Sequence, residues 1–514
     1  MRADPVGRFT TAWSRGSRSA SPYSARDSGS GKGTFLFLAA IGAIGACCIL
    51  LGVLRSGSPF VAHGSRSWFF TSPYVAATHA EGTGQFLGIM LVYLGIALML
   101  GAWYETLRAT RASSHMQLSR LALLLVVWAA PVLLAPPLFS RDVYSYAAQG
   151  EMVTRGLNPY LHGPSALGGG SFLNLVDPLW RHAAAPYGPA WERLSGWVVQ
   201  LSGHDVLGAV LGFRLIAVVG VSLLAWAVPA LARSIGRDGS LAFVLAVLNP
   251  LVLLVLLGGS HNDALMLGLL VAGCAFASRH HVLSGLLLCA LAAEVKIPAL
   301  IAATFIGWTW AGSGSTPRHR VSRTGLAVLF TLGVMVLIGA LSGLGWRWTG
   351  AVFGAGTVVS WLDPATAVGL LLAHAASAFG YHGGSSGFVQ STRDIGLAAA
   401  VVISIRLLAR SDRFGPIEAL GWSLLAFVLL GPIVWPWYET WSFVFLAMVA
   451  KRWVLRLVII LSTIACFADV PSPHLLIAAP TGLVVVCWAV LVGLVGLYVV
   501  NRQPLHLRRL KPVG

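Results

Sequence analysis

An aspartate follows the end of a long apolar segment, in the stretch "LFSRDVYSYAAQG" that covers residues 138–150. The apolar segment closes on a double proline, at which a helix cannot continue without a large cost. Asp142 therefore stands where apolar chain gives way to polar chain, and its carboxylate could accept a proton as a general base. The position also suits a cap on the short amphipathic helix "VYSYAAQGEMVTRG", and the two roles are compatible.

Three cations could bind phosphate on the same side of the apolar segments as Asp142. Arg214 lies about two turns into a predicted helix, Lys296 stands in "AAEVKIP", and Arg393 directly precedes another predicted helix. Arginine forms forked hydrogen bonds with phosphate oxygens, and lysine supplies a point charge. Snorkelling, in which the stem lies in lipid and the charge reaches water, is the alternative explanation for these cations.

The motif "GSHNDAL" places His261, Asn262 and Asp263 together between two apolar runs. No second histidine or carboxylate follows at zinc-ligand spacing nearby, so local sequence supports a metal site only weakly. Hydrogen bonding to a polar headgroup explains the cluster at least as well. We therefore expect no cofactor, and the sequence leaves the need for a divalent metal ion open.

Aromatic residues alternate with prolines in three further motifs, "NPY" at 158–160, "APYGPAW" at 185–191 and "PWYETW" at 436–441. Such residues can anchor a protein at the membrane interface, or they can stack on a sugar ring. Glu439 in the last motif fits an anchor less well. The transfer of a sugar from a lipid phosphate needs a base that activates the acceptor and cations that stabilise the leaving group. The sequence places a carboxylate, phosphate-binding cations and aromatic residues on one side of the membrane, and together they form such a set.

The elements that must position these residues are membrane-spanning helices. The 514 residues are 56% hydrophobic and 10% charged, with a mean hydropathy of +0.77, whereas soluble proteins carry about 25% charged residues. Apolar runs of about 15–25 residues recur along the chain, and lipid leaves no partner for free backbone groups, so each run is predicted to be a helix. The six cysteines lie within these runs and show neither metal spacing nor a place for a disulfide.

The distribution of charge predicts the orientation in the membrane. The chain has 35 Lys and Arg against 18 Asp and Glu, which gives a net charge of +17. Most of the Lys and Arg fall in the two tails and in alternate loops. This is the positive-inside pattern, so both termini are predicted to be cytosolic and nucleic acid is not an expected partner. Most of the Asp and Glu then fall on the outer side, which suggests chemistry at the outer face.

We predict an all-α, polytopic membrane protein with about 13–14 transmembrane helices. A disordered basic cytosolic tail is expected over 1–33, a multi-spanning domain over 34–500 and a second basic cytosolic tail over 501–514. The third helix is expected at about 119–138, and the polar stretch 139–205 after it is a large outer loop, too long for a simple connector. The short apolar segment "ATAVGLLLAHAASAFG" is expected to be interfacial or re-entrant, because counting it as a span would invert the charge rule.

The motifs, taken in order, resemble a known family. "SRDVYSYAAQG", "GLNPY", "APYGPAW", "HNDALM", the Lys of "AEVKIP", the Arg of "STRDIG" and "PWYETW" are similar to motifs of the actinobacterial polyprenol-phosphate-mannose-dependent α-(1→6)-mannopyranosyltransferases of lipomannan synthesis. The similarity runs from about the first to the fourteenth predicted helix, and the order of the motifs is more specific than any one of them. The resemblance implies a GT-C-type glycosyltransferase bundle in the plasma membrane, with its active site on the outer face.

The resemblance also implies a reaction, in which mannose passes from polyprenyl-phosphate mannose to the growing α-(1→6)-mannan backbone of lipomannan or lipoarabinomannan, on mannosylated phosphatidylinositol. The donor sugar is β-linked, so an α product means inversion, with Asp142 in the first large outer loop as the base. The residues expected to bind substrate are Arg141, Tyr144, Tyr187, Arg214, His261, Asn262, Asp263, Lys296, Arg393, Trp437, Tyr438 and Glu439. A transporter or flippase of a lipid-linked sugar, or a non-catalytic membrane scaffold, remains an alternative.

Overall fold

The computed structural model describes residues 24–54, 83–112, 116–354, 359, 363–449 and 451–468, which form helices and no strand. The predicted all-α class is confirmed. Helix α1 spans Ser24–Leu54 and so begins within the predicted N-terminal tail. Residues 1–23, the predicted C-terminal tail and the last predicted helix lie outside the described residues.

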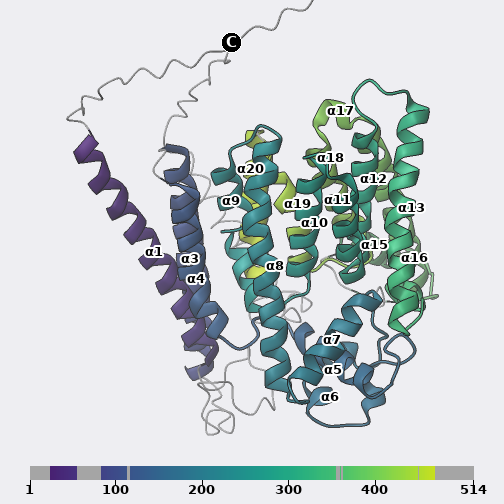
Figure 1. Cartoon of the computed structure of the whole chain (residues 1–514). Coiled ribbons are helices and arrows are strands. Elements are labelled where there is room, and N and C mark those ends of the chain that lie inside the picture. Colours follow the sequence, from purple (N-terminus) through teal and green to yellow (C-terminus); the bar gives the residue numbers. More distant parts are fainter. Residues whose placement is uncertain are drawn as a thin grey trace, which may run out of the picture.

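Helices α1, α3 (Thr83–Ala112) and α4 (Leu118–Leu134) lie side by side at one edge of the bundle (Figure 1). The backbones of α1 and α3 approach closely, because a Cβ on Gly45 would lie 2.8 Å from the carbonyl oxygen of Gly95. Small residues allow this kind of close helix packing in membranes. The glycines of the first two apolar runs therefore serve to join these helices.

Within the described part of the chain, four helices are long and apolar enough to cross a membrane. They lie in α1, α3, α8 (Val206–Ser234) and α13 (Pro317–Ser342). A fifth span is formed if η3 (Val252–Gly258) and α10 (Asp263–Ala277), bent by 114° at a short break, count together. The polytopic membrane class is confirmed, while the count of about 13–14 spans stays a prediction.

Shorter helices complete the bundle. They are α9 (Gly239–Ala246), α11 (Val282–Val295), η4 (Ile297–Leu300), α12 (Ile301–Trp310), α14 (Trp348–Gly354), α15 (Pro364–Ala378), α16 (Ser386–Ala409), α17 (Ser411–Phe414), α18 (Pro416–Leu430), η6 (Pro436–Glu439), α19 (Thr440–Leu446) and α20 (Arg452–Ala468). The apolar segment expected to be interfacial or re-entrant forms α15, which packs on α16.

The predicted large outer loop is itself mostly helical. It contains α5 (Asp142–Thr154), η1 (Pro164–Leu167), α6 (Ser171–Leu175), η2 (Pro178–Trp180) and α7 (Pro189–Leu201). Helices α5, α6 and α7 gather at one end of the bundle, and α17 lies at the opposite end (Figure 1). This segment is therefore a packed cap on one end of the bundle, and it carries Asp142.

Two helix starts differ from the sequence prediction. The charge pattern of the sequence predicts a basic inner loop at "GSGSTPRHRVSR". Its residues "PRHRVSR" instead form the first two turns of α13, because Pro317 suits the first helical position and the hydroxyl of Thr316 accepts a hydrogen bond from the N–H of His319. Arg393, expected just before a helix, lies within α16. Both helices begin with polar turns, which hydropathy does not detect.

Candidate active site

Asp142 is the first residue of α5, and Arg141 occupies the capping position before it. The carboxylate of Asp142 is therefore not the N-cap that the sequence allowed. The hydroxyl of Ser140 accepts a hydrogen bond from the N–H of Asp142 at 3.2 Å. The Asp142 side chain is 17% exposed, and its Oδ2 lies 3.6 Å from Nδ1 of His261. The aspartate thus faces the "GSHNDAL" motif.

Burial raises the pKa of Asp142 from its ordinary value to about 7. The positive charge of Lys296 lowers this pKa, while the negative charges of Asp263 and Asp177 raise it. A general base works best when its pKa lies near the working pH, because it is then both ionised and basic enough. The carboxylate therefore has the proton affinity that the predicted role requires.

The backbone on both sides of the site is strained. Phe139 before α5 has a φ of 61°, and Ser260 in the break between η3 and α10 has a φ of 54°. The N–H of Leu138 donates to the carbonyl of Gly258 at 3.0 Å and so joins the two segments. Left-handed non-glycine residues persist only where the surroundings hold them, and they concentrate at functional sites.

Arg214 of α8 holds these segments together. Its Nη1 donates to the carbonyls of Leu133 and Ala135 at 2.8 and 2.6 Å, and its Nη2 donates to the carbonyl of Gly258 at 3.2 Å. Helix ends leave carbonyls without helical partners, and a buried guanidinium can satisfy several at once. The buried Arg214 therefore connects the end of α4 to the break that carries His261.

Lys296 forms a buried ion pair with Asp263. Its Nζ donates to Oδ2 of Asp263 at 2.7 Å, and Nε1 of Trp441 donates to the other carboxylate oxygen at 2.6 Å. The same ammonium lies 4.6 Å from the ring centroid of Tyr438 and 6.0 Å from that of Tyr187. These contacts bring α10, the end of α11, η6 and α19 together around one positive charge.

Stacked aromatic rings form another part of the candidate site. His261 stacks on Trp437 with ring centroids 4.2 Å apart, and Tyr438 stacks on Trp441 at 4.3 Å. Tyr146, one turn after Asp142 in α5, donates to Oδ1 of Asn262 at 3.2 Å. It also packs edge-on against Tyr187, at 5.5 Å. The predicted aromatic tips therefore meet the predicted polar motif.

Four buried polar atoms of this site have no hydrogen-bond partner among the described residues. They are Nδ1 of His261, Nδ2 of Asn262, Nε1 of Trp437 and Oε2 of Glu439. Burial also raises the pKa of Glu439 to about 8. Buried polar groups normally have partners, since desolvation without one is costly. Four such atoms on two adjoining segments are candidate contacts for a polar ligand.

Arg393 is linked through Asp363 to the residues just before the "PWYETW" motif. Its Nε donates to the hydroxyl of Thr366 at 2.9 Å, and its Nη2 lies 3.9 Å from Oδ2 of Asp363. Oδ1 of Asp363 in turn accepts a hydrogen bond from the N–H of Val434, just before Trp435. Arg393 thus ties α16 to the start of the "PWYETW" motif.

Three residues of the candidate site were not predicted from the sequence. Tyr146 could have been found from its helical spacing after Asp142, and Trp441 closes a motif already singled out. Asp363 carried no local signal.

Tyr144 is buried in α5, and Arg141 is partly buried at the start of that helix. Among the described residues no group of three or more His, Cys, Asp or Glu could hold a metal ion, and the expectation of no cofactor stays a prediction.

Comparison with known families gives two matches. The model described as "Alpha-(1->6)-mannopyranosyltransferase, N-terminal domain" matches residues 39–312, and that described as "MptB C-terminal domain" matches residues 365–499.

Curated relatives carry the same name. Alpha-(1->6)-mannopyranosyltransferase A of Mycobacterium tuberculosis is 33% identical over 433 residues, which is 80% of each chain. Alpha-(1->6)-mannopyranosyltransferase B of Corynebacterium glutamicum is 30% identical over 486 residues, which is 88% of this chain and 79% of the relative. A probable alpha-(1->6)-mannopyranosyltransferase of Mycolicibacterium smegmatis is 34% identical over 72% of both chains.

Proposed function

The chain belongs to the α-(1→6)-mannopyranosyltransferase family and is a mannosyltransferase, and from this premise we propose that it transfers mannose from polyprenyl-phosphate mannose to a growing α-(1→6)-mannan backbone of lipomannan or lipoarabinomannan. The proposal rests chiefly on the partly buried carboxylate of Asp142, which lies 3.6 Å from His261, beside the ion pair of Lys296 and Asp263. Membership in a transferase family decides against the transporter and the scaffold that the sequence left open.

In the proposed reaction, Asp142 takes the proton of an acceptor hydroxyl as its oxygen bonds to the anomeric carbon of mannose. The bond from that carbon to the phosphate oxygen breaks on the opposite face, so the β-linked donor gives an α product. The leaving polyprenyl phosphate carries away the electron pair. An inverting transfer of this kind needs only one carboxylate as the base. Burial raises the pKa of Asp142 to about 7, which suits this role.

Lys296 is the cation that we assign to the leaving phosphate. A phosphate near it would share the ammonium with Asp263 and could accept hydrogen bonds from Nδ2 of Asn262 and Nε1 of Trp437, which have no other partner among the described residues. Fixed donors of this kind stabilise developing negative charge. We assign positioning roles to Arg214 and Arg393, because their guanidinium groups hold backbone carbonyls and Asp363.

A reconstituted transfer assay tests this function. Purified protein in lipid nanodiscs, given polyprenyl-phosphate mannose and a short α-(1→6)-mannooligosaccharide, is expected to add one α-(1→6)-linked mannose, identified by product linkage analysis. Equal transfer from a nucleotide sugar without the lipid donor would contradict the proposal. A new linkage other than α-(1→6) would contradict the acceptor assignment.

The proposed location is the plasma membrane, with both termini cytosolic and the α5–α7 end of the bundle outside. In a variant without its six natural cysteines, His182→Cys in the α5–α7 segment is expected to react with a membrane-impermeant maleimide in intact cells. Arg413→Cys in α17, at the opposite end, is expected to react only after permeabilisation. The reverse pattern would overturn the proposed orientation.

The raised pKa of Asp142 predicts a pH dependence. The base must be ionised to act, so kcat/KM is expected to rise with pH through about 7 and to level off above it. Well below that pH, each unit is expected to lower kcat/KM about tenfold, because the ionised fraction falls tenfold. Initial rates in one lipid composition, from about pH 5.5 to 8.5, measure the profile. A flat profile over that range would exclude Asp142 as the titrating base.

A further inference from the structure

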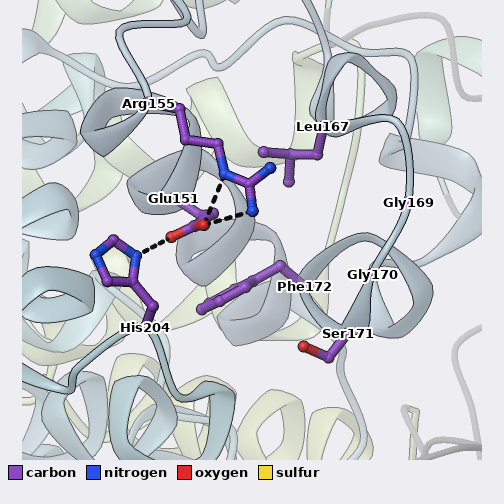
Figure 2. A pocket seen from close by; sticks show the side chains of 8 residues that line it. All are labelled: Glu151, Arg155, Leu167, Gly169, Gly170, Ser171, Phe172 and His204. Atoms are coloured by element: carbon purple, nitrogen blue, oxygen red, sulfur yellow. Dashed lines mark hydrogen bonds and ion pairs between the residues drawn. The ribbon is translucent and has the colours of Figure 1, made fainter.

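A cavity of about 180 Å³ lies near the end of α5 that is far from Asp142. Glu151 and Arg155 with His204 line one side, and Phe172 with Ser171 of α6 lines another (Figure 2). Drug-sized ligands occupy pockets of roughly 300–1,000 Å³, so a cavity of this size suits a single ring. None of these residues belongs to the candidate active site.

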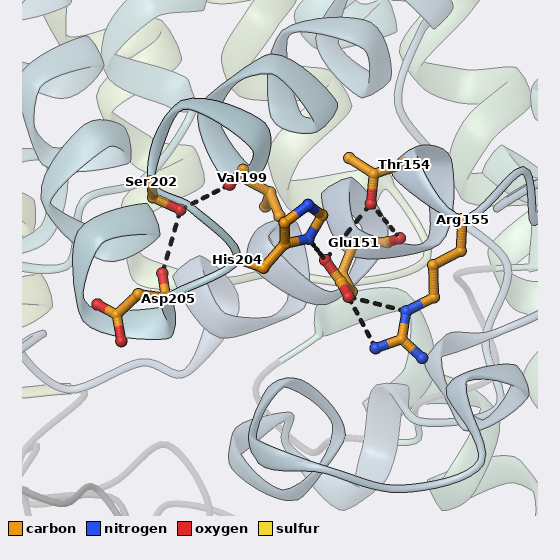
Figure 3. Close-up of polar contacts among 7 residues, drawn as sticks. All are labelled: Glu151, Thr154, Arg155, Val199, Ser202, His204 and Asp205. Carbon is orange, nitrogen blue, oxygen red and sulfur yellow. Dashed lines mark hydrogen bonds and ion pairs between the residues drawn. The ribbon is translucent and has the colours of Figure 1, made fainter.

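The charges of the cavity favour a neutral ligand. Glu151 is buried, its Oε1 lies 2.7 Å from Nη2 of Arg155, and its Oε2 lies 2.6 Å from Nδ1 of His204 (Figure 3). The buried carboxylate repels an anion, and the guanidinium repels a metal cation. A neutral molecule with many hydroxyls meets neither penalty, and it can use acceptors and donors together.

The hydrogen-bonding groups of the cavity are fixed and partly open to solvent. Arg155 and His204 have side chains 52% and 50% exposed, and Ser171 is exposed. A guanidinium carries five N–H donors, of which the contacts with Glu151 use two. Donors fixed by a buried partner beside the aromatic ring of Phe172 match a sugar, whose hydroxyls need hydrogen bonds and whose C–H face packs on an aromatic ring.

The backbone around the cavity includes three glycines that face open space and a histidine in a constrained turn. Gly168, Gly169 and Gly170 all have positive φ, and a Cβ on any of them would meet nothing within 4 Å. His204 has a φ of 60°, and the hydroxyl of Ser202 fixes its turn by donating to the carbonyl of Val199 at 2.8 Å (Figure 3). The glycine segment therefore borders open space, and the histidine is held in a conformation that non-glycine residues rarely adopt.

Glu151 follows Asp142 by nine residues of α-helix, which is about 13.5 Å along the axis and about half a turn around it. A ring in this cavity is therefore too far from Asp142 to carry the reacting hydroxyl. We propose that the cavity binds a mannose residue of the acceptor chain away from its reacting end, an assignment that rests on the proposed function for the identity of the acceptor. The cavity then makes the enzyme favour long acceptors over short ones.

Acceptor length tests this proposal. Arg155→Met keeps an apolar stem and removes the donors. For this variant, the KM for an α-(1→6)-mannohexaose is expected to rise about tenfold relative to the KM for an α-(1→6)-linked mannose disaccharide. A change of this size is expected from the loss of a charge-assisted hydrogen bond. Ser171→Tyr, which fills the opening and leaves the ion pairs of Glu151 in place, is expected to do the same. His182→Ala, an exposed histidine of the same segment outside the cavity, is the matched control and is expected to change neither KM.

Binding to an inactive protein separates this proposal from the proposed function. Saturation-transfer NMR with Asp142→Asn protein and mannohexaose is expected to show contacts that Ser171→Tyr removes, whether or not transfer occurs. An unchanged ratio of the two KM values in both variants would overturn the subsite. Equal loss for both acceptors with a lower Tm would assign Arg155 and Glu151 to folding alone. Binding of myo-inositol but of neither oligosaccharide would contradict mannose as the ligand.

Discussion

Asp142→Asn is expected to lower the rate of mannosyl transfer by about 10²–10⁴, the usual contribution of a general base. The amide has the size of the carboxylate and keeps the N–H contact with Ser140, but it cannot take a proton from the acceptor. Folding should survive, because Arg141 rather than Asp142 occupies the capping position of α5. Single-turnover transfer from polyprenyl-phosphate mannose, measured beside the Tm in the same nanodiscs, tests both statements.

Asp205→Asn provides the matched control for this prediction. Asp205 lies at the end of the 139–205 segment that contains Asp142, and its Oδ2 accepts a hydrogen bond from the N–H of Gly208 at 2.7 Å, at the start of α8. Asparagine caps a helix about as well as aspartate, so this variant should transfer mannose at the wild-type rate. If Asp142→Asn also elongated mannan at nearly that rate, the proposed base would be wrong. The small residual activity that we expect should not vary with pH near 7.

Asp142 could be singled out from local sequence, because its signal is local, and its role as the base stays a prediction. A double proline ends α4, and the first polar residues after it begin α5. The same holds for the aromatic tips and for "GSHNDAL", since each lies at the end of an apolar run. Such boundaries predict on which side of the membrane these residues lie, and that assignment stays a prediction.

The partners of these residues could not be predicted, because packing between distant segments decides them. Asp263 receives hydrogen bonds from Lys296 and from Trp441, which is 178 residues away. Nothing in the sequence around Arg214 shows that carbonyls at the end of α4 lie against its guanidinium, and its predicted contact with phosphate is untested. Because the first turns of α16 are polar, this helix was predicted to begin only after Arg393, whereas it begins at Ser386.

The second large effect is expected for Lys296→Met. Lys296 and Asp263 are both buried, so removal of the ammonium leaves a carboxylate without its counter-charge. Breaking a buried pair in this way typically costs about 3–5 kcal/mol of stability. Transfer by the variant should therefore be lost together with folded protein. The single variant cannot separate a structural role of Lys296 from a role in phosphate binding, because both predict the same loss.

Asp263→Asn combined with Lys296→Met separates the two roles. The amide oxygen can still accept the hydrogen bond of Trp441, and no buried charge remains, so the Tm should return towards the wild-type value. If Lys296 stabilises the leaving phosphate, transfer by the folded double variant should stay about 10²–10³ below wild type, the usual loss when a fixed donor to a developing anion is removed. Thermal unfolding and single-turnover transfer on the same sample measure the two quantities.

Arg108→Met is the control for the loss of a cation from an ion pair. Nε of Arg108 lies 2.8 Å from Oε2 of Glu105, outside the candidate active site, and the two side chains are 42% and 35% exposed. Water can replace such a partner, so the variant should lose at most about 1 kcal/mol of stability and keep its transfer rate. Recovery of both stability and transfer in the double variant would show that Lys296 only balances Asp263. Recovery of stability alone is the result that places the donor phosphate beside Lys296, because the pair has then been removed without loss of the fold.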